Sequence, residues 1–421
     1  MPTFPGLDIE IIRNQPELVR SSLVARGLDV TLLDQALVAD ETYRNSLTAL
    51  ELASQEKNRV TKLLSTRPAN FDELKAQAKE FGANHNALAT ERDNALAALA
   101  EITAQIPNLV HPEVPLGGED DYVVLKTHGE FPKKNFELKS HDELGLTLGL
   151  YDAERGVKVS GSRFVFLKGA GAILEKALID YALAKAIASG FIPLTTPTLV
   201  KPEIMEGTGF TTKHNDEIYY LPADDLYLTG TNEVALAGYH AGEILTLDET
   251  LNYVGISTCY RREAGAAGRD TRGIIRLHQF NKLEGFIYTT VGDAEAQHAN
   301  LLALQEEILQ GLGLHYRVID TAAGDLGTSA YRKYDVEAWI PSQNRFLELT
   351  SSSNCLTYQA KQLDIRERTA EGNKAAATLN GTLATTRWLV AILEQHQDEN
   401  GNVKIPEVLL PYTHGITELV G

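Results

Sequence analysis

The chain has 421 residues, of which 43% are hydrophobic and 23% charged, and its formal net charge is −18 at pH 7. These proportions are typical of a globular protein, and the length predicts more than one domain. No apolar run is long enough to cross a bilayer, and we expect no signal peptide because the N-terminal stretch lacks a basic start followed by an apolar segment. The two cysteines, Cys259 and Cys355, lie far apart, which argues against a disulfide framework and against a cysteine-rich metal site. We therefore expect a cytoplasmic protein, and its acidic charge argues against indiscriminate binding to nucleic acid.

Residues from about 33 to 106 carry a pattern typical of a coiled coil. Apolar residues recur at alternating steps of three and four, and a break at 65–73 contains the turn formers Pro68 and Asn70. We expect two long helices that fold back antiparallel. The predicted seam consists of Tyr43, Leu50, Ala53, Val60, Leu64, Leu74, Ala78, Phe81, Leu88, Ala95, Leu99, Ile102 and Ile106. Because Lys57, His85 and Arg92 also fall on the seam, tight packing along its whole length is not expected.

Basic residues gather at the expected tip of this hairpin. Lys57, Arg59, Lys62 and Arg67 occur in a stretch without any acid, from Lys57 to Phe71. Charge alone leaves two interpretations open, which are a solvated helix end and a surface that contacts a phosphate backbone.

A proline-rich segment at 107–121 is predicted to be an extended linker between an N-terminal domain, 1–106, and a second domain, 122–421. In the second domain short strand-like segments follow one another without a regular alternation of strand and helix. This pattern favours an antiparallel α+β domain over a doubly wound parallel sheet. Predicted strands include 163–169, 251–263 and 274–290, and predicted helices include 172–189 and 385–397.

Positive charge in this acidic chain is concentrated in the stretch YRREAGAAGRDTRGIIRLHQFNKLEGF, residues 260–286. Alternate residues of a strand face the same side. The residues that share a side are then Arg261 with Glu263 on the first strand, and Phe280, Lys282, Glu284 and Phe286 on the second. A guanidinium, a carboxylate and an aromatic ring around one pocket suit a nucleotide, whereas cross-strand ion pairs are the alternative for any one of these residues. No P-loop or dinucleotide-binding motif is present.

The same stretch resembles motif 2 of the class II aminoacyl-tRNA synthetases, and in particular of the seryl-tRNA synthetase family. Further blocks of that family are KVSGSRFVFLKG (158–169), GTNEVALAGYH (230–240), GDLGTSAYRKYDVEAW (324–339), ELTSSSNC (348–355), LNGT (379–382) followed by Arg387, and PEVLLPY (406–412). The helical hairpin and the linker also match, so the resemblance covers nearly the whole chain. It implies a class II antiparallel sheet flanked by helices, behind an N-terminal coiled-coil arm. It also implies ATP-dependent, AMP-forming activation of L-serine and transfer to tRNA(Ser), with tRNA(Sec) as a further candidate substrate.

The resemblance assigns an ATP site. Arg261 would bind the α-phosphate, Phe280 would stack on adenine, and Arg387 would cover the other face and reach the γ-phosphate. Arg261 and Arg387 are therefore the candidate catalytic residues. Glu348 and Ser351 would hold Mg²⁺ across the phosphates, because oxygen ligands suit this cation, and no zinc is expected. The whole implied ATP site is Arg261, Arg262, Glu263, Leu277, Phe280, Glu348, Leu349, Thr350, Ser351 and Arg387.

The resemblance also assigns a serine site, which consists of Thr231, Asn232, Glu233, Glu284 and Thr382. Carboxylates would bind the substrate ammonium, and polar groups that bond the hydroxyl would exclude alanine. Threonine would be excluded by size. Asn232 and Thr382 depart from the alanine and serine that are most usual in the family, and the stretch before Arg387 is shorter than in many relatives.

Two further features are implied. Pro197 resembles the motif 1 proline at a dimer interface, so we expect a homodimer. The basic tip of the arm, with Lys57, Arg59, Lys62 and Arg67, would then contact tRNA, bound across the two subunits.

Three alternative functions compete with this one: a ligase that loads an amino acid onto a carrier protein, a non-catalytic RNA-binding paralogue, and a coiled coil that merely dimerises. The long arm argues against the first, the retained arginines and acids argue against the second, and the downstream blocks argue against the third.

Overall fold

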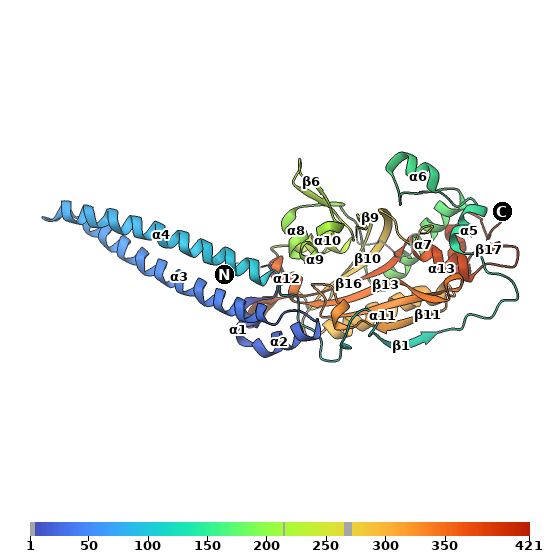
Figure 1. Cartoon of the computed structure of the whole chain (residues 1–421), viewed down its shortest axis with the longest axis horizontal. Coiled ribbons are helices and arrows are strands. Elements are labelled where there is room, and N and C mark those ends of the chain that lie inside the picture. The colour runs from blue at the N-terminus through green and yellow to red at the C-terminus, as the bar shows by residue number, and fades with distance from the viewer. Residues whose placement is uncertain (1–4, 214, 265–271) are drawn as a thin grey trace. The chain divides into compact units, whose positions relative to one another are not determined.

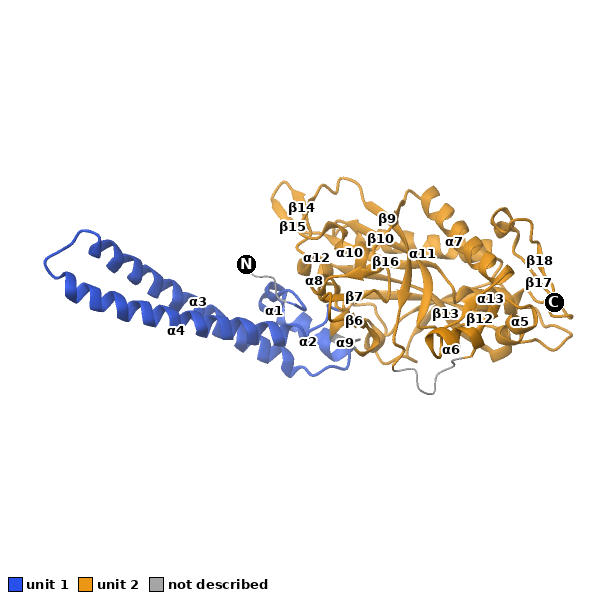
Figure 2. Ribbon diagram, turned by 90° about the horizontal axis from the view of Figure 1, so that it is seen from above, with its two compact units in different colours: residues 1–109 blue, residues 110–421 orange. Residues whose placement is uncertain are grey.

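The computed structural model describes residues 5–213, 215–264 and 272–421. They form two compact units, with the boundary between Leu109 and Val110 (Figure 2). This boundary falls inside the predicted linker, 107–121. No helix among the described residues is long and apolar enough to span a membrane.

The first unit consists of two short and two long helices, α1 (Ile9–Asn14), α2 (Pro16–Ala25), α3 (Thr31–Leu64) and α4 (Phe71–Thr103). The long helices run antiparallel, side by side, and are joined by residues 65–70 (Figure 1). The predicted helical hairpin is confirmed. Its fully buried seam residues are Tyr43, Ala53, Val60, Leu74, Ala95, Leu99 and Ile106. At Lys57, His85 and Arg92 the seam is only half-buried, because these polar side chains keep part of their surface in solvent.

The second unit is built on an eight-stranded sheet in which β4–β9 is the parallel pair and the other pairs are antiparallel. In spatial order the strands are β1 (Val123–His128), β11 (Tyr316–Asp320), β12 (Arg332–Ile340), β13 (Arg345–Leu356), β16 (Ala377–Thr385), β10 (Gln279–Thr289), β9 (Leu251–Tyr260) and β4 (Ile192–Thr195). The predicted antiparallel α+β fold is confirmed. Because β13, β16, β10 and β9 are neighbours, side chains far apart in the sequence meet on one face of the sheet.

Three helices supply most of the packing around this sheet: α7 (Ala170–Ala188), α11 (Ala294–Gly311) and α13 (Trp388–Gln395). Helix α11 covers one face, where its Leu301 lies against Gly285 of β10 and Gly381 of β16. Successive residues of a strand face opposite sides, so Glu284 and Thr382 point away from α11. The functional face of the sheet is therefore the one opposite α11.

The remaining elements are short. The helices are α5 (His141–Thr147), α6 (Ala153–Ser160), α8 (Pro202–Gly207), α9 (Phe210–Lys213), α10 (Glu233–Ala237) and α12 (Tyr358–Gln362). The strands are β2 (Tyr151–Asp152), β3 (Phe166–Leu167), β5 (Leu199–Val200), β6 (Tyr219–Leu221), β7 (Leu226–Leu228), β8 (Ile244–Leu245), β14 (Arg366–Thr369), β15 (Gly372–Ala375), β17 (Val403–Lys404) and β18 (Glu418–Leu419).

Three predicted strands are shorter than expected. Only Phe166–Leu167 pairs within 163–169, the segment 251–263 leaves the sheet after Tyr260, and the segment 274–290 enters it only at Gln279. The last difference has a clear cause, because the carbonyl of Ile275 accepts a hydrogen bond from Arg387 instead of from a neighbouring strand. The apolar residues before Gln279 thus form a wall of a pocket.

Candidate active site

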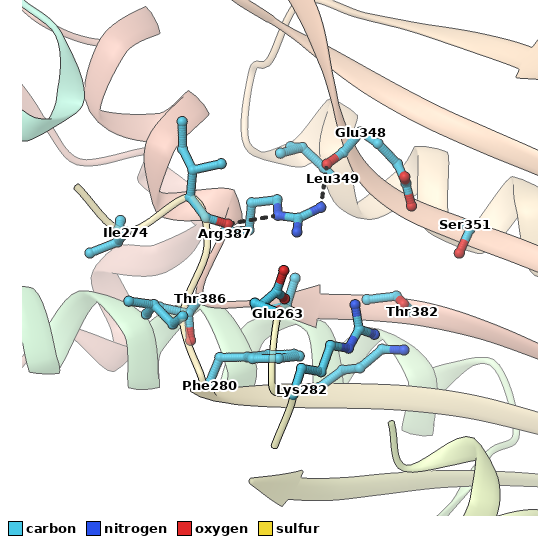
Figure 3. A pocket seen from close by; sticks show the side chains of 14 residues that line it. Glu263, Ile274, Phe280, Lys282, Glu348, Leu349, Ser351, Thr382, Thr386 and Arg387 are labelled. Carbon is cyan, nitrogen blue, oxygen red and sulfur yellow. Dashed lines mark hydrogen bonds between the residues drawn. The ribbon is translucent and has the colours of Figure 1, made fainter. Parts of the chain in front are cut away.

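A pocket lies on the functional face of the sheet, and Figure 3 shows its lining side chains. It brings together most of the residues predicted for ATP. These are Arg261, Glu263, Leu277, Phe280, Glu348, Leu349, Ser351 and Arg387, and they are joined by Thr382 from the predicted serine site. The other lining residues are Ile274, Ile275, Lys282, Thr385 and Thr386.

One side of the pocket is formed by Arg261, which directly follows β9, and by Phe280 of the neighbouring strand β10. The guanidinium carbon of Arg261 lies 5.2 Å from the ring centroid of Phe280, which is within the range of a cation–π contact. The Nε of Arg261 donates to the carbonyl of Gly230 at 3.0 Å. This bond fixes the side chain while its terminal nitrogens stay directed at the pocket.

The opposite side is formed by Arg387, the N-cap residue of α13 (Figure 3). Its Nε donates to the carbonyl of Ile275 and its Nη1 to the carbonyl of Glu348, both at 3.3 Å. Burial lowers the pKa of Arg387, although the nearby carboxylate of Glu348 acts in the other direction. Arginine stays protonated in proteins, so the pocket presents a second fixed cation.

Glu348 and Ser351 of β13 contribute oxygen ligands to the pocket, and Figure 3 shows both side chains on the same wall. Burial alone would raise the pKa of Glu348. The charges of Lys333, Arg387, Arg261 and Lys282 outweigh burial and lower it, so the carboxylate is ionised at neutral pH. An ionised carboxylate beside a hydroxyl is a donor set that suits Mg²⁺, which usually takes its other ligands from phosphates and water.

Glu263 occupies an unusual position in the backbone. Its φ is +50°, which ends the strand alternation that the sequence predicts beyond Tyr260. Two arginines hold it, since Arg276 Nη1 donates to its carboxylate at 2.9 Å and Arg163 Nη1 donates to its carbonyl at 3.0 Å. Glu263 therefore links the outgoing and the returning limb of motif 2.

A buried polar cluster adjoins the pocket at Lys282. The Lys282 ammonium pairs with Glu284 and donates to Thr231 Oγ1 at 2.9 Å. Thr231 Oγ1 in turn donates to Glu284 Oε2 at 3.1 Å. All three side chains are at least nine-tenths buried. The cluster places one ammonium beside one carboxylate, so it is neutral by itself.

Glu233, from the start of α10, adds a second carboxylate. Its Oε1 accepts from Gln359 Nε2 at 2.8 Å and from Asn380 Nδ2 at 2.9 Å. Burial, followed by the charge of Glu284, raises the pKa of Glu233 to about 7. When Glu233 is ionised, two carboxylates face a single ammonium, Lys282, and this region carries an unbalanced negative charge.

Three of the predicted residues direct their side chains away from the pocket. Arg262 donates from Nε to the carbonyl of Ile218 at 2.9 Å, and Thr350 Oγ1 accepts from Gln305 of α11 at 3.0 Å. The carboxamide of Asn232 is fully buried and accepts a hydrogen bond from Thr196 Oγ1. None of these three residues is among those that line the pocket.

The residues predicted for tRNA and for the dimer lie outside the pocket. Arg59, Lys62 and Arg67 are exposed and Lys57 is half-buried, and Arg59 also pairs with Glu56 at 2.9 Å. Pro197 lines a surface depression beside the edge strand β4. The glycine-rich part of motif 2, residues 265–271, lies outside the described residues.

Sequence reasoning assigned no role to four residues of this region: Lys282, Arg276, Gln359 and Asn380. A role for Lys282 could have been predicted, because it lies between Phe280 and Glu284 at steps of two on one strand, so that the three side chains share a face. Asn380 carried a weaker signal, since it lies two residues before Thr382 on β16. Gln359 had no such signal, because only the tertiary fold brings α12 to Glu233.

Comparison with known proteins agrees with this architecture. The family model of the seryl-tRNA synthetase N-terminal domain matches residues 7–110, and that of the tRNA synthetase class II core domain (G, H, P, S and T) matches residues 217–396. The serine–tRNA ligase of Leifsonia xyli subsp. xyli is 57% identical over 97% of this chain and 98% of its own length. The serine–tRNA ligase of Clavibacter sepedonicus is 54% identical over 98% of both chains. The crystal structure of seryl-tRNA synthetase from Pyrococcus horikoshii complexed with ATP has a TM-score of 0.90, with 38% identity over 98% of this chain and 99% of that chain. The chain therefore belongs to the seryl-tRNA synthetase family of class II aminoacyl-tRNA synthetases.

Proposed function

We propose that this protein activates L-serine with ATP to form seryl-adenylate and pyrophosphate, and then transfers the seryl group to tRNA(Ser). The observation that carries the proposal is the juxtaposition of two sites. The guanidiniums of Arg261 and Arg387 line a pocket that adjoins, at Lys282, the buried carboxylates of Glu233 and Glu284. Such an arrangement suits a polyphosphate next to an amino acid.

In the first step a carboxylate oxygen of serine would attack the α-phosphorus of ATP, and the bond from that phosphorus to the bridging oxygen of pyrophosphate would break. The serine carboxylate is already ionised, so no general base is needed. Negative charge spreads over the phosphate oxygens in the transition state, and guanidiniums fixed in advance stabilise it without reorganising. Each well-aimed donor of this kind contributes ~3–4 kcal/mol. The rest of the catalysis would be positioning.

Phe280 would stack on adenine, with Arg387 on its other face. Their positions on opposite sides of the pocket support this proposal (Figure 3). Glu348 and Ser351 would hold Mg²⁺, and the ion would neutralise phosphate charge and orient the leaving pyrophosphate.

The serine ammonium would bind between Glu233 and Glu284. It would balance the negative charge that the single ammonium of Lys282 leaves over, and charge-assisted hydrogen bonds would hold it. Thr231 and Thr382 would surround the substrate hydroxyl. An alanine substrate would leave such buried polar groups without a partner, which is a strong basis for rejection.

The arm and the dimer complete the proposal. We infer that the basic tip, Lys57, Arg59, Lys62 and Arg67, binds the backbone of tRNA, and the exposure of Arg59, Lys62 and Arg67 supports this role. We also infer that two subunits associate around Pro197, with tRNA bound across them. The exposed apolar side chains of Leu199 and Tyr239, which line the same depression as Pro197, are consistent with a covered surface.

Pyrophosphate exchange without tRNA, measured with each common amino acid in turn, tests the proposed function. We expect serine-dependent exchange far above that with alanine or threonine. Exchange that is equal for several amino acids, or absent with serine, would refute it.

A further inference from the structure

Gln359 of α12 is fully buried, and its carboxamide is bonded at both ends. Its Oε1 accepts a hydrogen bond from Thr378 Oγ1 at 2.8 Å, and its Nε2 donates to Glu233 Oε1 at 2.8 Å. Thr378, Gln359 and Glu233 thus form a relay that runs from strand β16 through α12 to α10.

The chemistry of the groups fixes the direction of this relay. An ionised carboxylate can only accept, so the NH₂ group of Gln359 must face Glu233. The carbonyl oxygen of Gln359 must then face Thr378, whose hydroxyl has to donate. Thr378 therefore holds the amide in the single orientation that bonds Glu233.

A second amide converges on the same atom. Asn380 Nδ2 donates to Glu233 Oε1 at 2.9 Å, and it lies on the same face of β16 as Thr378. Both donors thus bond one carboxylate oxygen. Among the described residues no hydrogen bond joins the other oxygen, Oε2, to a side chain or main-chain group, and Glu233 keeps 8% of its surface exposed. One oxygen is fixed and the other is left for a ligand.

The two amides also act on the charge of Glu233. Burial and the charge of Glu284 disfavour the ionised carboxylate, whereas hydrogen bonds from neutral donors favour it. Without the two amides, the carboxylate of Glu233 would be buried beside the like charge of Glu284 with fewer hydrogen bonds, so its ionised form would be less favourable.

We propose that Gln359 and Asn380 are positioning residues that orient Glu233 for the substrate ammonium, and that Thr378 fixes the amide of Gln359. This inference rests on the proposed function, because it assumes that Glu233 binds the amino group of serine. The competing explanation is that these bonds only pack α12 against the sheet.

Steady-state pyrophosphate exchange of the full-length enzyme separates the two explanations. Gln359→Leu keeps much of the volume but removes the donor, and we expect its KM for serine to rise about 10- to 100-fold while its KM for ATP stays within about twofold. Asn380→Ala should act in the same direction. Thr378→Val removes only the group that orients the amide, so its effect on the serine KM should be smaller, about 3- to 10-fold.

Gln395→Leu is the matched control. Gln395 is a buried glutamine whose Nε2 donates to the main-chain carbonyls of Trp339 and His315, at 2.8 Å and 3.1 Å. Its loss should lower the melting temperature without separating the KM for serine from the KM for ATP.

The pH dependence of the KM for serine is a further measurement, which a purely structural role of Gln359 would not change. The charged or titratable groups that act on Glu233 are Glu284, Lys282, Arg261 and Cys355. Gln359→Leu leaves these groups in place but removes a hydrogen bond that lowers the pKa of Glu233. The rise in the KM for serine at acid pH should therefore begin at a higher pH than in wild type.

The outcomes are distinct. A folded Gln359→Leu enzyme with an unchanged serine KM, alongside a raised serine KM in Glu233→Gln, overturns the inference but leaves the proposed function intact. Unchanged serine KM values in both variants overturn the proposed role of Glu233 itself. If Gln359→Leu does not fold, Thr378→Val decides, because an unchanged serine KM in that folded variant overturns the inference.

Discussion

The guanidinium of Arg261 lies over the ring of Phe280, 5.2 Å from its centroid. Strand register produces this contact, because Phe280 of β10 pairs with Cys259 of β9, two residues before Arg261. A strand pair therefore places a phosphate-binding group and a base-stacking group at a fixed separation. The proposed nucleotide site depends on this relationship.

Arg261→Ala should reduce serine-dependent pyrophosphate exchange by at least about 100-fold, because it removes a donor aimed at developing charge. Arg262→Ala is the matched control, since its guanidinium bonds the carbonyl of Ile218 and lies 4.6 Å from the ring centroid of Tyr219, away from the pocket. Its exchange rate should stay within a few-fold of wild type. Both variants should elute at the same volume as the wild-type protein in size-exclusion chromatography. Retained exchange in Arg261→Ala would remove the phosphate assignment.

The affinity for serine should depend on pH near neutrality. Burial and Glu284 raise the pKa of Glu233 from 4.5 to about 7, so the carboxylate becomes protonated as the pH falls below that value. The KM for serine should then rise, by up to about tenfold per pH unit. The stability of the ligand-free protein should follow the opposite trend with pH, because its folded state binds the Glu233 proton more tightly than the unfolded state does. The contribution of Glu233 to stability is therefore greatest below the unfolded pKa and falls as the pH rises between the two values.

Glu233→Gln provides the control for this pH dependence. Its KM for serine should be high throughout, and it should lack the acid limb between pH 6 and 8 (the range set by the pKa of about 7). An identical acid limb in wild type and Glu233→Gln would assign the titration to another group.

Gly273→Ala should weaken ATP binding. The φ of Gly273 is +56°, and a Cβ there would lie 2.4 Å from Nε2 of the buried His141. His141 is itself held by Glu394 of α13, and its Nε2 faces the carbonyl of Arg272 at 3.4 Å. The added methyl group would displace this limb of the chain. Ile274 and Ile275, which line the pocket, lie on the same limb and would shift with it.

The expected result for Gly273→Ala is a loss of about 1–3 kcal/mol in unfolding free energy together with a raised KM for ATP. Thermal unfolding and exchange kinetics measure the two effects. Gly292→Ala, where the nearest atom to a Cβ is Thr290 Oγ1 at 3.7 Å, should change neither. A wild-type ATP KM in Gly273→Ala would show that this limb does not position the pocket wall.

Neutralising Lys57, Arg59, Lys62 and Arg67 together should weaken tRNA charging and spare pyrophosphate exchange. The residues are on the helical hairpin, whereas the exchange reaction needs only the pocket of the second unit. The KM for tRNA should rise, and its dependence on salt should become less steep as phosphate contacts are lost. A parallel fall in exchange and charging would show that the tip does not act through tRNA.

The sequence was sufficient to predict features in which apolar residues recur at a regular spacing, or in which many residues of a motif lie close together. The three-and-four spacing from Tyr43 to Leu99 gave the hairpin, and strand alternation around motif 2 correctly grouped Phe280 with Lys282. Prediction failed where the backbone departs from the period. Beyond Tyr260 the chain is no longer a strand, and before Gln279 it follows the carbonyl contacts made by Arg387.

The direction of individual side chains also escaped sequence reasoning. Asn232 lies inside a motif, yet its buried carboxamide accepts a hydrogen bond from Thr196. Gln359 lies outside the residues assigned to the site, yet it bonds Glu233. Such contacts depend on how short helices pack on the sheet, and no local pattern encodes them.

The most direct test of the proposed function is a crystal structure of the protein with a non-hydrolysable mimic of seryl-adenylate. We predict that Arg261 bonds the phosphoryl oxygens, that adenine lies between Phe280 and Arg387, and that the ammonium group reaches Glu233 and Glu284. A mimic bound elsewhere, or bound here with both guanidiniums turned away from the phosphoryl group, would contradict it.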